Sequence, residues 1–191
     1  MANFNTAFMV VMRNEDPDLS GVVTPEPHGG KARFGINSLA HPEAVREGFY
    51  EMTNTEAWIY AEDIFKYDYW SKVWGYDIKD QNIANKFVDL AFNLAAAPAT
   101  KIIQRAINSL HTVLVLTVDG QVGPLTMTAL NFENPELLMA AIKIYGTQYY
   151  KDILAAHPEF QKYYHGWIVR LMGLVERGVT APHLHTLLPE R

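Results

Sequence analysis

The chain reads Glu15-Asp-Pro-Asp-Leu-Ser-Gly21, and shortly afterwards His28-Gly-Gly-Lys-Ala-Arg-Phe-Gly-Ile-Asn37, in its only long run that is poor in helix-forming residues. This run is crowded with glycine, proline and acids, which favour turns and loops. Most of the sequence after it has apolar residues at the three- and four-residue spacing of amphipathic helices. We therefore expect a scaffold of helices that presents this segment as a loop.

The second part of the segment predicts a small β-ribbon. Gly29, Gly30 and Gly35 allow backbone turns that other residues disfavour. Phe34 and Ile36 alternate with smaller residues, as in a short strand.

Glu15 is the candidate catalytic residue, because it stands at the end of a helix expected over residues 5–14. The carbonyl end of a helix disfavours a carboxylate by roughly 0.3–1 kcal/mol. Asp16 and Asp18 add like-charge repulsion, and partial burial would act in the same direction. All these effects favour the protonated acid near neutral pH, which a proton donor in catalysis needs. The alternative reading is a solvated acidic turn.

Capping residues and apolar stripes predict further helices over residues 42–47, 54–71, 81–97, 98–110, 124–131, 135–156 and 158–178. The capping residues include a capping box of Thr53 with Glu56 and N-caps at Asp80 and Asn134. The β-branched and aliphatic run over residues 113–118 meets Asp119-Gly120, a turn signal that predicts a second small hairpin.

Several side chains on these helices are open to two interpretations. Tyr69 and Trp70 are adjacent, so on one helix they point about 100° apart. At most one should be fully buried, and the other is a candidate wall of a binding cleft, unless both simply pack. Asn93 either holds loop backbone or faces substrate, with the structural role slightly favoured.

Composition sets limits on the class of protein. With 191 residues, of which 49% are hydrophobic, the chain can form one compact domain. A net charge of −5 without a basic stripe argues against a nucleic-acid partner. There is no cysteine and no apolar run long enough to span a membrane. His183 and His185 lack the cysteines or H-E-x-x-H motif of metal sites, so we expect no metal and no other cofactor.

Motifs along nearly the whole chain resemble those of the family-108 glycoside hydrolases, which are lysozyme-like N-acetylmuramidases. In chain order they are Glu15, Gly29-Gly-Lys-Ala-Arg-Phe-Gly-Ile36, Asp68-Tyr-Trp70, Asp89-Leu-Ala-Phe-Asn93, Gln104, Val118-Asp-Gly-Gln-Val-Gly-Pro-Leu-Thr126 and Gly166-Trp-Ile-Val-Arg170. The chain departs from the pattern at four places: Asp16-Pro17 replaces two glycines, Pro27 an aspartate, Ala32 a threonine and Ala95 a glycine.

The resemblance implies a mainly α, lysozyme-like single domain with the small ribbon beside the active-site loop. Residues 1–97 would be the catalytic half, 98–178 the peptidoglycan-binding half and 179–191 a tail. Glu15 would be the general acid in cleavage of the β-1,4 bond between N-acetylmuramic acid and N-acetylglucosamine. Candidates for the second carboxylate are Glu26, Asp18 and Asp16, and candidates for substrate binding are His28, Asn37, Tyr69, Trp70, Asn93 and Gln104.

The implied partner is the glycan strand of peptidoglycan, bound by a monomer. The N-terminal residues lack the charged start of a secretory signal. We therefore expect synthesis in the cytoplasm and action on the cell wall after release by a holin or a secretion system, as in a phage endolysin. The rival hypothesis is a catalytically weakened peptidoglycan-binding or secretion-accessory module, which Pro27 and Ala32 favour.

Overall fold

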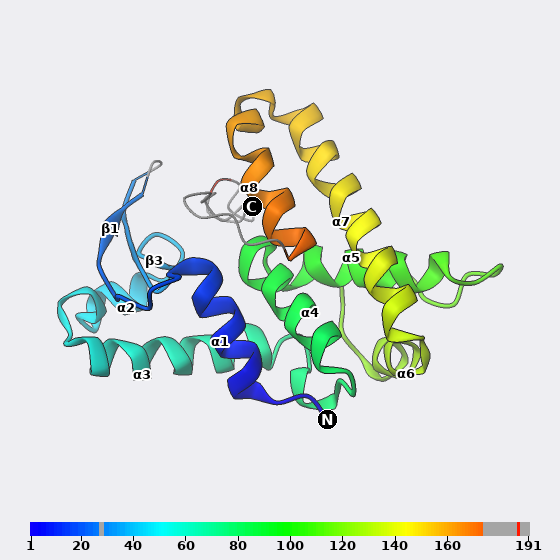
Figure 1. The fold of residues 1–191 in the computed structure, drawn as a ribbon, viewed down its shortest axis with the longest axis horizontal. Helices are drawn as coiled ribbons and strands as arrows, with labels where there is room; N and C mark the ends of the chain where they lie inside the picture. Colours follow the sequence, from blue (N-terminus) through cyan, green and yellow to red (C-terminus); the bar gives the residue numbers. More distant parts are fainter. Residues whose placement is uncertain (27–28, 174–186, 188–191) are drawn as a thin grey trace.

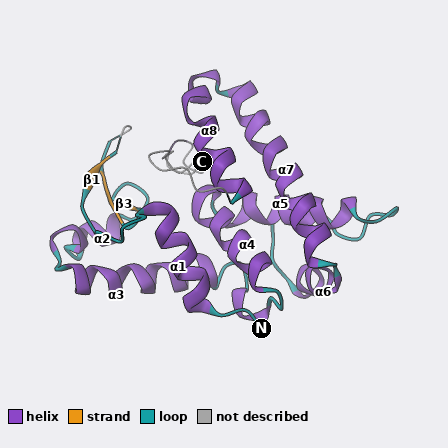
Figure 2. Cartoon of the chain, in the orientation of Figure 1, coloured by secondary structure: helices purple, strands orange, loops and turns teal. Residues whose placement is uncertain are grey.

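The computed structural model describes residues 1–26, 29–173 and 187, and within them the chain is mainly helical with one small sheet (Figures 1 and 2). The helices are α1 (Phe4–Glu15), α2 (Pro42–Arg46), α3 (Asn54–Ile64), α4 (Gln81–Leu94), α5 (Ala96–Ser109), α6 (Pro124–Phe132), α7 (Pro135–Ala156) and α8 (Gln161–Met172). Short helical turns complete them: η1 (Phe49–Glu51), η2 (Phe65–Trp70), η3 (Gly75–Asp77) and η4 (Pro158–Phe160). The expected fold class is confirmed.

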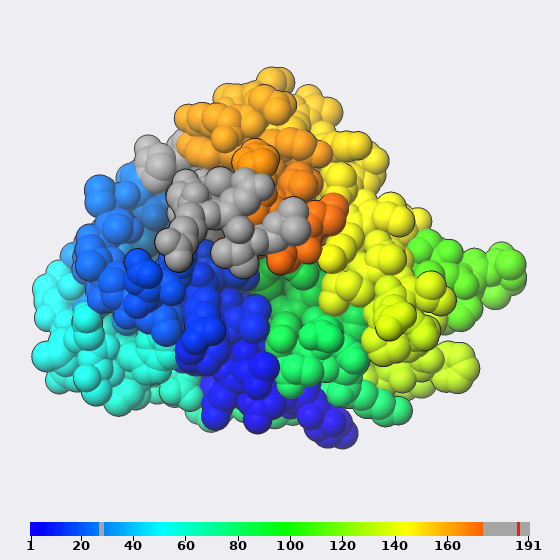
Figure 3. Space-filling model, viewed as in Figure 1, coloured from blue at the N-terminus to red at the C-terminus, as the bar shows by residue number. Residues whose placement is uncertain are grey.

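Helix α4 lies at the centre of the molecule and packs against α1, α5 and α7 (Figure 1). Its sequence explains this position, because ten of the residues from Ile83 to Leu94 are buried and eight of these ten are apolar. The buried residues of both halves of the chain form one hydrophobic cluster. In the space-filling view the blue surface of α1 lies directly against the green surface of α4 (Figure 3).

The expected β-ribbon is present as a three-stranded antiparallel sheet of β1 (Thr24–Pro25), β2 (Lys31–Arg33) and β3 (Ile36–Asn37). Arg33 anchors the ribbon to the helices, because its buried guanidinium donates to the carbonyls of Gly21, Phe49 and Met52. Both residues of the β2–β3 turn have positive φ, 49° at Phe34 and 74° at Gly35. Burial of the Phe34 ring against Trp58, with 5.3 Å between ring centroids, offsets the strain of this conformation.

Of the two interpretations of Tyr69 and Trp70, the structure favours the one in which both side chains pack in the interior. Helix α3 ends at Ile64 and continues as the π-helix η2 instead of as α-helix to residue 71. Tyr69 is 8% exposed and Trp70 is fully buried, because α1 and α4 both pack on η2. The indole of Trp70 contacts Phe4 and Tyr76 and therefore belongs to the core rather than to a glycan-binding wall.

The hairpin expected around residues 113–120 is also wrong, since the structure has no strand in this described segment. The amide of Asn108 on α5 instead bonds the backbone of Val115 and Leu116. These bonds satisfy the groups that a partner strand would have satisfied. Helix boundaries differ as well. Helix α4 ends at Leu94 and α5 begins at Ala96, before Pro98. Helix α8 ends at Met172 because Gly173 adopts a left-handed conformation.

Among the described residues, no helix combines the length and the apolar character needed to cross a bilayer. The predicted tail, residues 179–191, lies outside the described residues except for Leu187.

Candidate active site

Glu15 is the last residue of α1, and its side chain is only 10% exposed. The β2–β3 turn covers it. A methyl group added to Gly35 would lie 2.6 Å from Cγ of Glu15 and 2.9 Å from its Oε2. The backbone can come this close to Glu15 only at a residue without a side chain. Gly35 therefore allows the β2–β3 turn to pack directly against the Glu15 side chain.

Arg170 of α8 contacts Glu15 from the other half of the chain. Its Nη1 donates to Oε1 of Glu15 at 2.5 Å. The Arg170 side chain is 14% exposed, so this ion pair is largely shielded from water. The contact joins the end of the first helix to the last turns of the last one.

Asp89 of α4 binds the same guanidinium. Its Oδ1 accepts from Nε of Arg170 at 2.9 Å and lies 2.8 Å from Nη2. It also accepts from the amide of Asn14 at 3.0 Å, and its Oδ2 lies 3.7 Å from Nζ of Lys86. Burial alone would raise the pKa of Asp89, but Arg170 and Lys86 hold it below its ordinary value. Burial lowers the pKa of Lys86, against the pull of Asp89.

These four side chains form a charge cluster of Glu15, Lys86, Asp89 and Arg170, which is neutral when all four are ionised. Arg170 therefore favours the carboxylate form of Glu15. The carbonyl end of α1 and the burial of the side chain act in the opposite direction. The influences expected from the sequence all favoured the protonated form of Glu15. Arg170, 155 residues away in the chain, is an opposing influence that no local pattern predicted.

The three candidates for a second carboxylate lie in different surroundings. Asp16 folds the loop after α1, since its Oδ2 accepts from the backbone N–H of Gly21 at 2.7 Å. Glu26 stands at the β1–β2 turn, and so at the opposite end of β2 from the turn that touches Glu15. Asp18 is exposed on the loop after α1.

Tyr69 connects this region to a buried histidine. Its hydroxyl lies 2.9 Å from Nε2 of His41, which begins α2. Burial raises the pKa of Tyr69, and the negative charges of Asp68, Glu15 and Glu43 raise it further. Tyr69 thus lies within the electrostatic field of Glu15, although its ring is not available for stacking on a sugar.

The three amide side chains expected to bind substrate, Asn37, Asn93 and Gln104, form hydrogen bonds within the protein. Asn93 donates to the hydroxyl of Tyr150 at 2.7 Å, and Asn37 accepts from the backbone N–H of Leu39 at 2.7 Å. The Gln104 amide donates to Asp119 at 2.8 Å and accepts from the N–H of Gly120 at 2.9 Å. All three are buried, which favours the structural alternative for Asn93 and gives the other two a structural role. His28 lies outside the described residues.

The roles of Asp89, Arg170 and Lys86 were missed by sequence reasoning. Asp89 and Arg170 both stand in motifs that carried the family resemblance, but the motifs did not show that they pair. Their charges could have indicated the pairing, because a charged residue that is buried on the apolar face of a helix needs a partner of opposite charge.

Comparison with known proteins agrees with this architecture. Residues 20–94 match the family model of glycosyl hydrolase 108, and residues 98–172 match that of a predicted peptidoglycan domain. Glu15 lies just before the first matched region. No curated protein matches the chain. The solved structure of Brucella abortus SagA has a TM-score of 0.62 at 19% identity, over 93% of this chain and 98% of that one, which is a likeness of fold. A glycosyl hydrolase 108 region is thus followed in the chain by a predicted peptidoglycan domain, and the two matches together support a glycoside hydrolase that acts on peptidoglycan.

Proposed function

We propose that this protein is an N-acetylmuramidase and that Glu15 is its general acid. The observation that carries the proposal is the placement of Glu15: a mostly buried carboxyl at a helix end, held between the Gly35 turn and Arg170. A carboxyl fixed in this way can deliver its proton to one oxygen of a bound glycan. Proton transfer by a positioned group contributes about 10²–10⁴-fold to a rate.

Glu15 can act as the acid only while it carries a proton. The Arg170 guanidinium favours the carboxylate form, and Asp89, 2.8–2.9 Å from the same guanidinium, shares that positive charge. We infer that activity falls as the pH rises and Glu15 loses its proton.

For the second group we favour Asp18. Asp16 is already bonded to the Gly21 N–H, and Glu26 lies at the far end of β2. Asp18 is exposed on the loop that directly follows Glu15, where its carboxylate can meet a glycan or activate a water. We expect Asp18→Asn to lower turnover without lowering the melting temperature, and Asp16→Asn to lower the melting temperature.

The identity of the broken bond is tested by the products. Purified peptidoglycan is digested, the new reducing ends are reduced with borohydride, and the sugar at these ends is identified by mass spectrometry. Reduced N-acetylmuramic acid supports the proposal. Reduced N-acetylglucosamine at the new ends would make the enzyme a glucosaminidase and contradict it.

The ion pair of Glu15 with Arg170 also favours a second candidate, a peptidoglycan-binding module with little or no turnover. In that case the pair would serve to join α1 to α8, and the domain over residues 98–172 would carry the function. Sedimentation with insoluble peptidoglycan, without release of reducing ends at any pH from about 4 to about 8, the range in which carboxyl and histidine groups titrate, would establish this candidate instead. An export role through a holin or secretion system, with action in the cell wall, belongs to either candidate and is likewise a proposal.

A further inference from the structure

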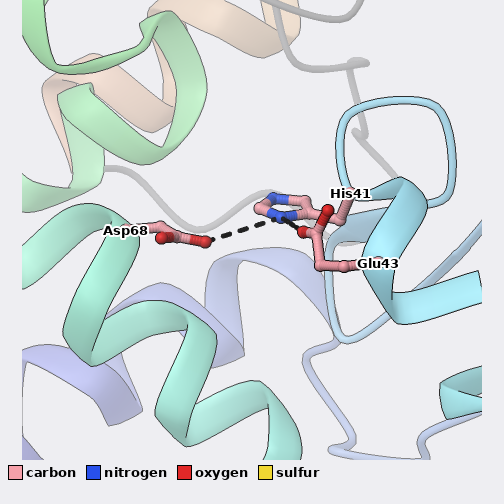
Figure 4. A group of neighbouring side chains, drawn as sticks. All are labelled: His41, Glu43 and Asp68. Atoms are coloured by element: carbon pink, nitrogen blue, oxygen red, sulfur yellow. Dashed lines mark hydrogen bonds and ion pairs between the residues drawn. The ribbon is translucent and has the colours of Figure 1, made fainter. Parts of the chain in front are cut away.

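His41, Glu43 and Asp68 form a cluster that the proposed function does not use (Figure 4). Nδ1 of His41 lies 3.0 Å from Oε1 of Glu43 and 3.7 Å from Oδ2 of Asp68. One ligand atom from each residue fits within a span of 4.8 Å. The His41 side chain is 8% exposed, whereas those of Glu43 and Asp68 are 40% and 48% exposed, so the cluster is buried on one side and open to solvent on the other.

The chain contains a natural comparison for this cluster, because the tripeptide His-Pro-Glu occurs twice. His157-Pro-Glu159 also begins a helical turn, and Nδ1 of His157 lies 3.3 Å from Oε1 of Glu159. The contact between histidine and glutamate is therefore a local feature of this tripeptide. Within the described residues, a third ligating group from another element, Asp68, lies close to His41, and no such group lies close to His157.

The element that supplies Asp68 is the π-helix η2. Consecutive residues of η2 contact both ring nitrogens of His41: Asp68 approaches Nδ1 at 3.7 Å and Tyr69 bonds Nε2 at 2.9 Å. Single turns of π-helix inside α-helices are frequently found at functional sites. The Tyr69 hydroxyl fixes the orientation of the imidazole, as outer partners of metal-bound histidines commonly do.

We propose that His41 Nδ1, Glu43 and Asp68 bind a divalent first-row transition-metal ion, for which Zn²⁺ is the probe. Imidazole with two carboxylates is a ligand set that Zn²⁺ accepts, and three protein ligands leave one position for water. Metal–ligand bonds of about 2.0–2.2 Å place the ligand atoms of a tetrahedral site about 3.3–3.6 Å apart. The two separations that involve His41, 3.0 and 3.7 Å, lie on either side of this range, and the Glu43 and Asp68 oxygens lie within 4.8 Å of each other, so side-chain movements would complete the site.

Binding would have a consequence for Tyr69. A metal on Nδ1 requires the proton of the neutral imidazole to be on Nε2, which then donates to the Tyr69 oxygen. The Tyr69 O–H proton would be directed away from His41.

The proposal is tested by titration of Zn²⁺ into the full chain in a calorimeter, with melting temperature as a second measurement. We expect the wild type to bind Zn²⁺ at one site. In Asp68→Asn the affinity for Zn²⁺ should fall by more than the roughly 10–100-fold effect of losing a residue that only supports a metal ligand. Asp68 is half exposed, so this variant should fold normally. Two controls should retain wild-type affinity: His157→Ala, which removes the other His-Pro-Glu histidine, and a variant in which His183 and His185 are both Ala.

Three results would overturn the proposal: no saturable binding by the wild type, equal binding by Asp68→Asn, or loss of binding in either control. None of them depends on catalytic activity, so a failed metal site and a failed muramidase proposal can be told apart.

Discussion

Gly35 is the residue on which the position of Glu15 depends most directly. It combines a φ of +74° with backbone contact to the Glu15 side chain. The positive φ disfavours other residues because of backbone strain, and the close contact with Glu15 leaves no space for a side chain. Gly48 separates the two effects, since it has a φ of +73° and nothing within 4 Å of where a Cβ would stand.

We predict that Gly35→Ala lowers activity strongly and Gly48→Ala does not. Both changes force alanine into the left-handed region, which costs roughly 1–2 kcal/mol. Only the change at Gly35 also pushes against Cγ of Glu15, 2.6 Å from the new methyl group. Urea unfolding and reducing-end release measure the two effects. Equal loss of activity in the two variants would mean that the turn does not position Glu15.

At the scale of elements, the charge cluster holds α1, α4 and α8 together. Asp89, with a 4% exposed side chain, and Arg170 are too buried to be left without partners. Removing one partner of a buried ion pair typically costs about 3–5 kcal/mol, because the other charge remains in the interior. The ion pair of Lys31 with Glu51 provides a contrast, since its 2.7 Å separation is similar but its side chains are 38% and 67% exposed.

A double-mutant cycle of Arg170→Met and Asp89→Asn should therefore show strong coupling. We expect an interaction free energy of about 1–3 kcal/mol, compared with about 0–1 kcal/mol for Lys31→Met and Glu51→Gln. Chemical denaturation of the four proteins of each cycle gives these values. Coupling no larger at the buried pair than at the exposed one would show that the cluster does not hold the three helices together.

The helices and their contacts also show which features could be predicted from the sequence. Local signals were readable: the capping box of Thr53 with Glu56 and the caps at Asp80 and Asn134 are all present. They are readable because a cap and its helix lie within a few residues of each other. The pairing of Glu15 with Arg170 was not readable, because nothing local records which buried charges meet across the chain.

The same distinction explains the errors. A β-branched run with Asp-Gly predicted a hairpin at residues 113–120, but Asn108 of α5 took the place of the partner strand. The periodicity over residues 54–71 identified a helix but not its change to π geometry at Phe65, which buries Tyr69 and Trp70 together. In both cases packing by a distant element decided the outcome.

At the scale of the whole molecule, acid stability should report on the cluster. Because the folded-state pKa of Asp89 is held below its ordinary value of 3.8, its contribution to the unfolding free energy is complete above that pH. The contribution is lost as the pH falls through the folded-state pKa. We predict that the difference in unfolding free energy between wild type and Asp89→Asn is largest near neutral pH and shrinks as the pH falls toward about 2. Urea unfolding at a series of pH values measures it, and a difference that stays constant with pH would contradict the assigned role of Asp89.

The whole account depends on Glu15 as the proton donor. The most direct measurement is the rate of reducing-end release from purified peptidoglycan by wild type, by Glu15→Gln, and by Glu136→Gln, which makes the same change at an exposed glutamate of α7. We predict that Glu15→Gln loses about 10²–10⁴-fold in rate at acidic pH but still sediments with the wall, while Glu136→Gln matches wild type. Equal rates for wild type and Glu15→Gln would show that another group donates the proton.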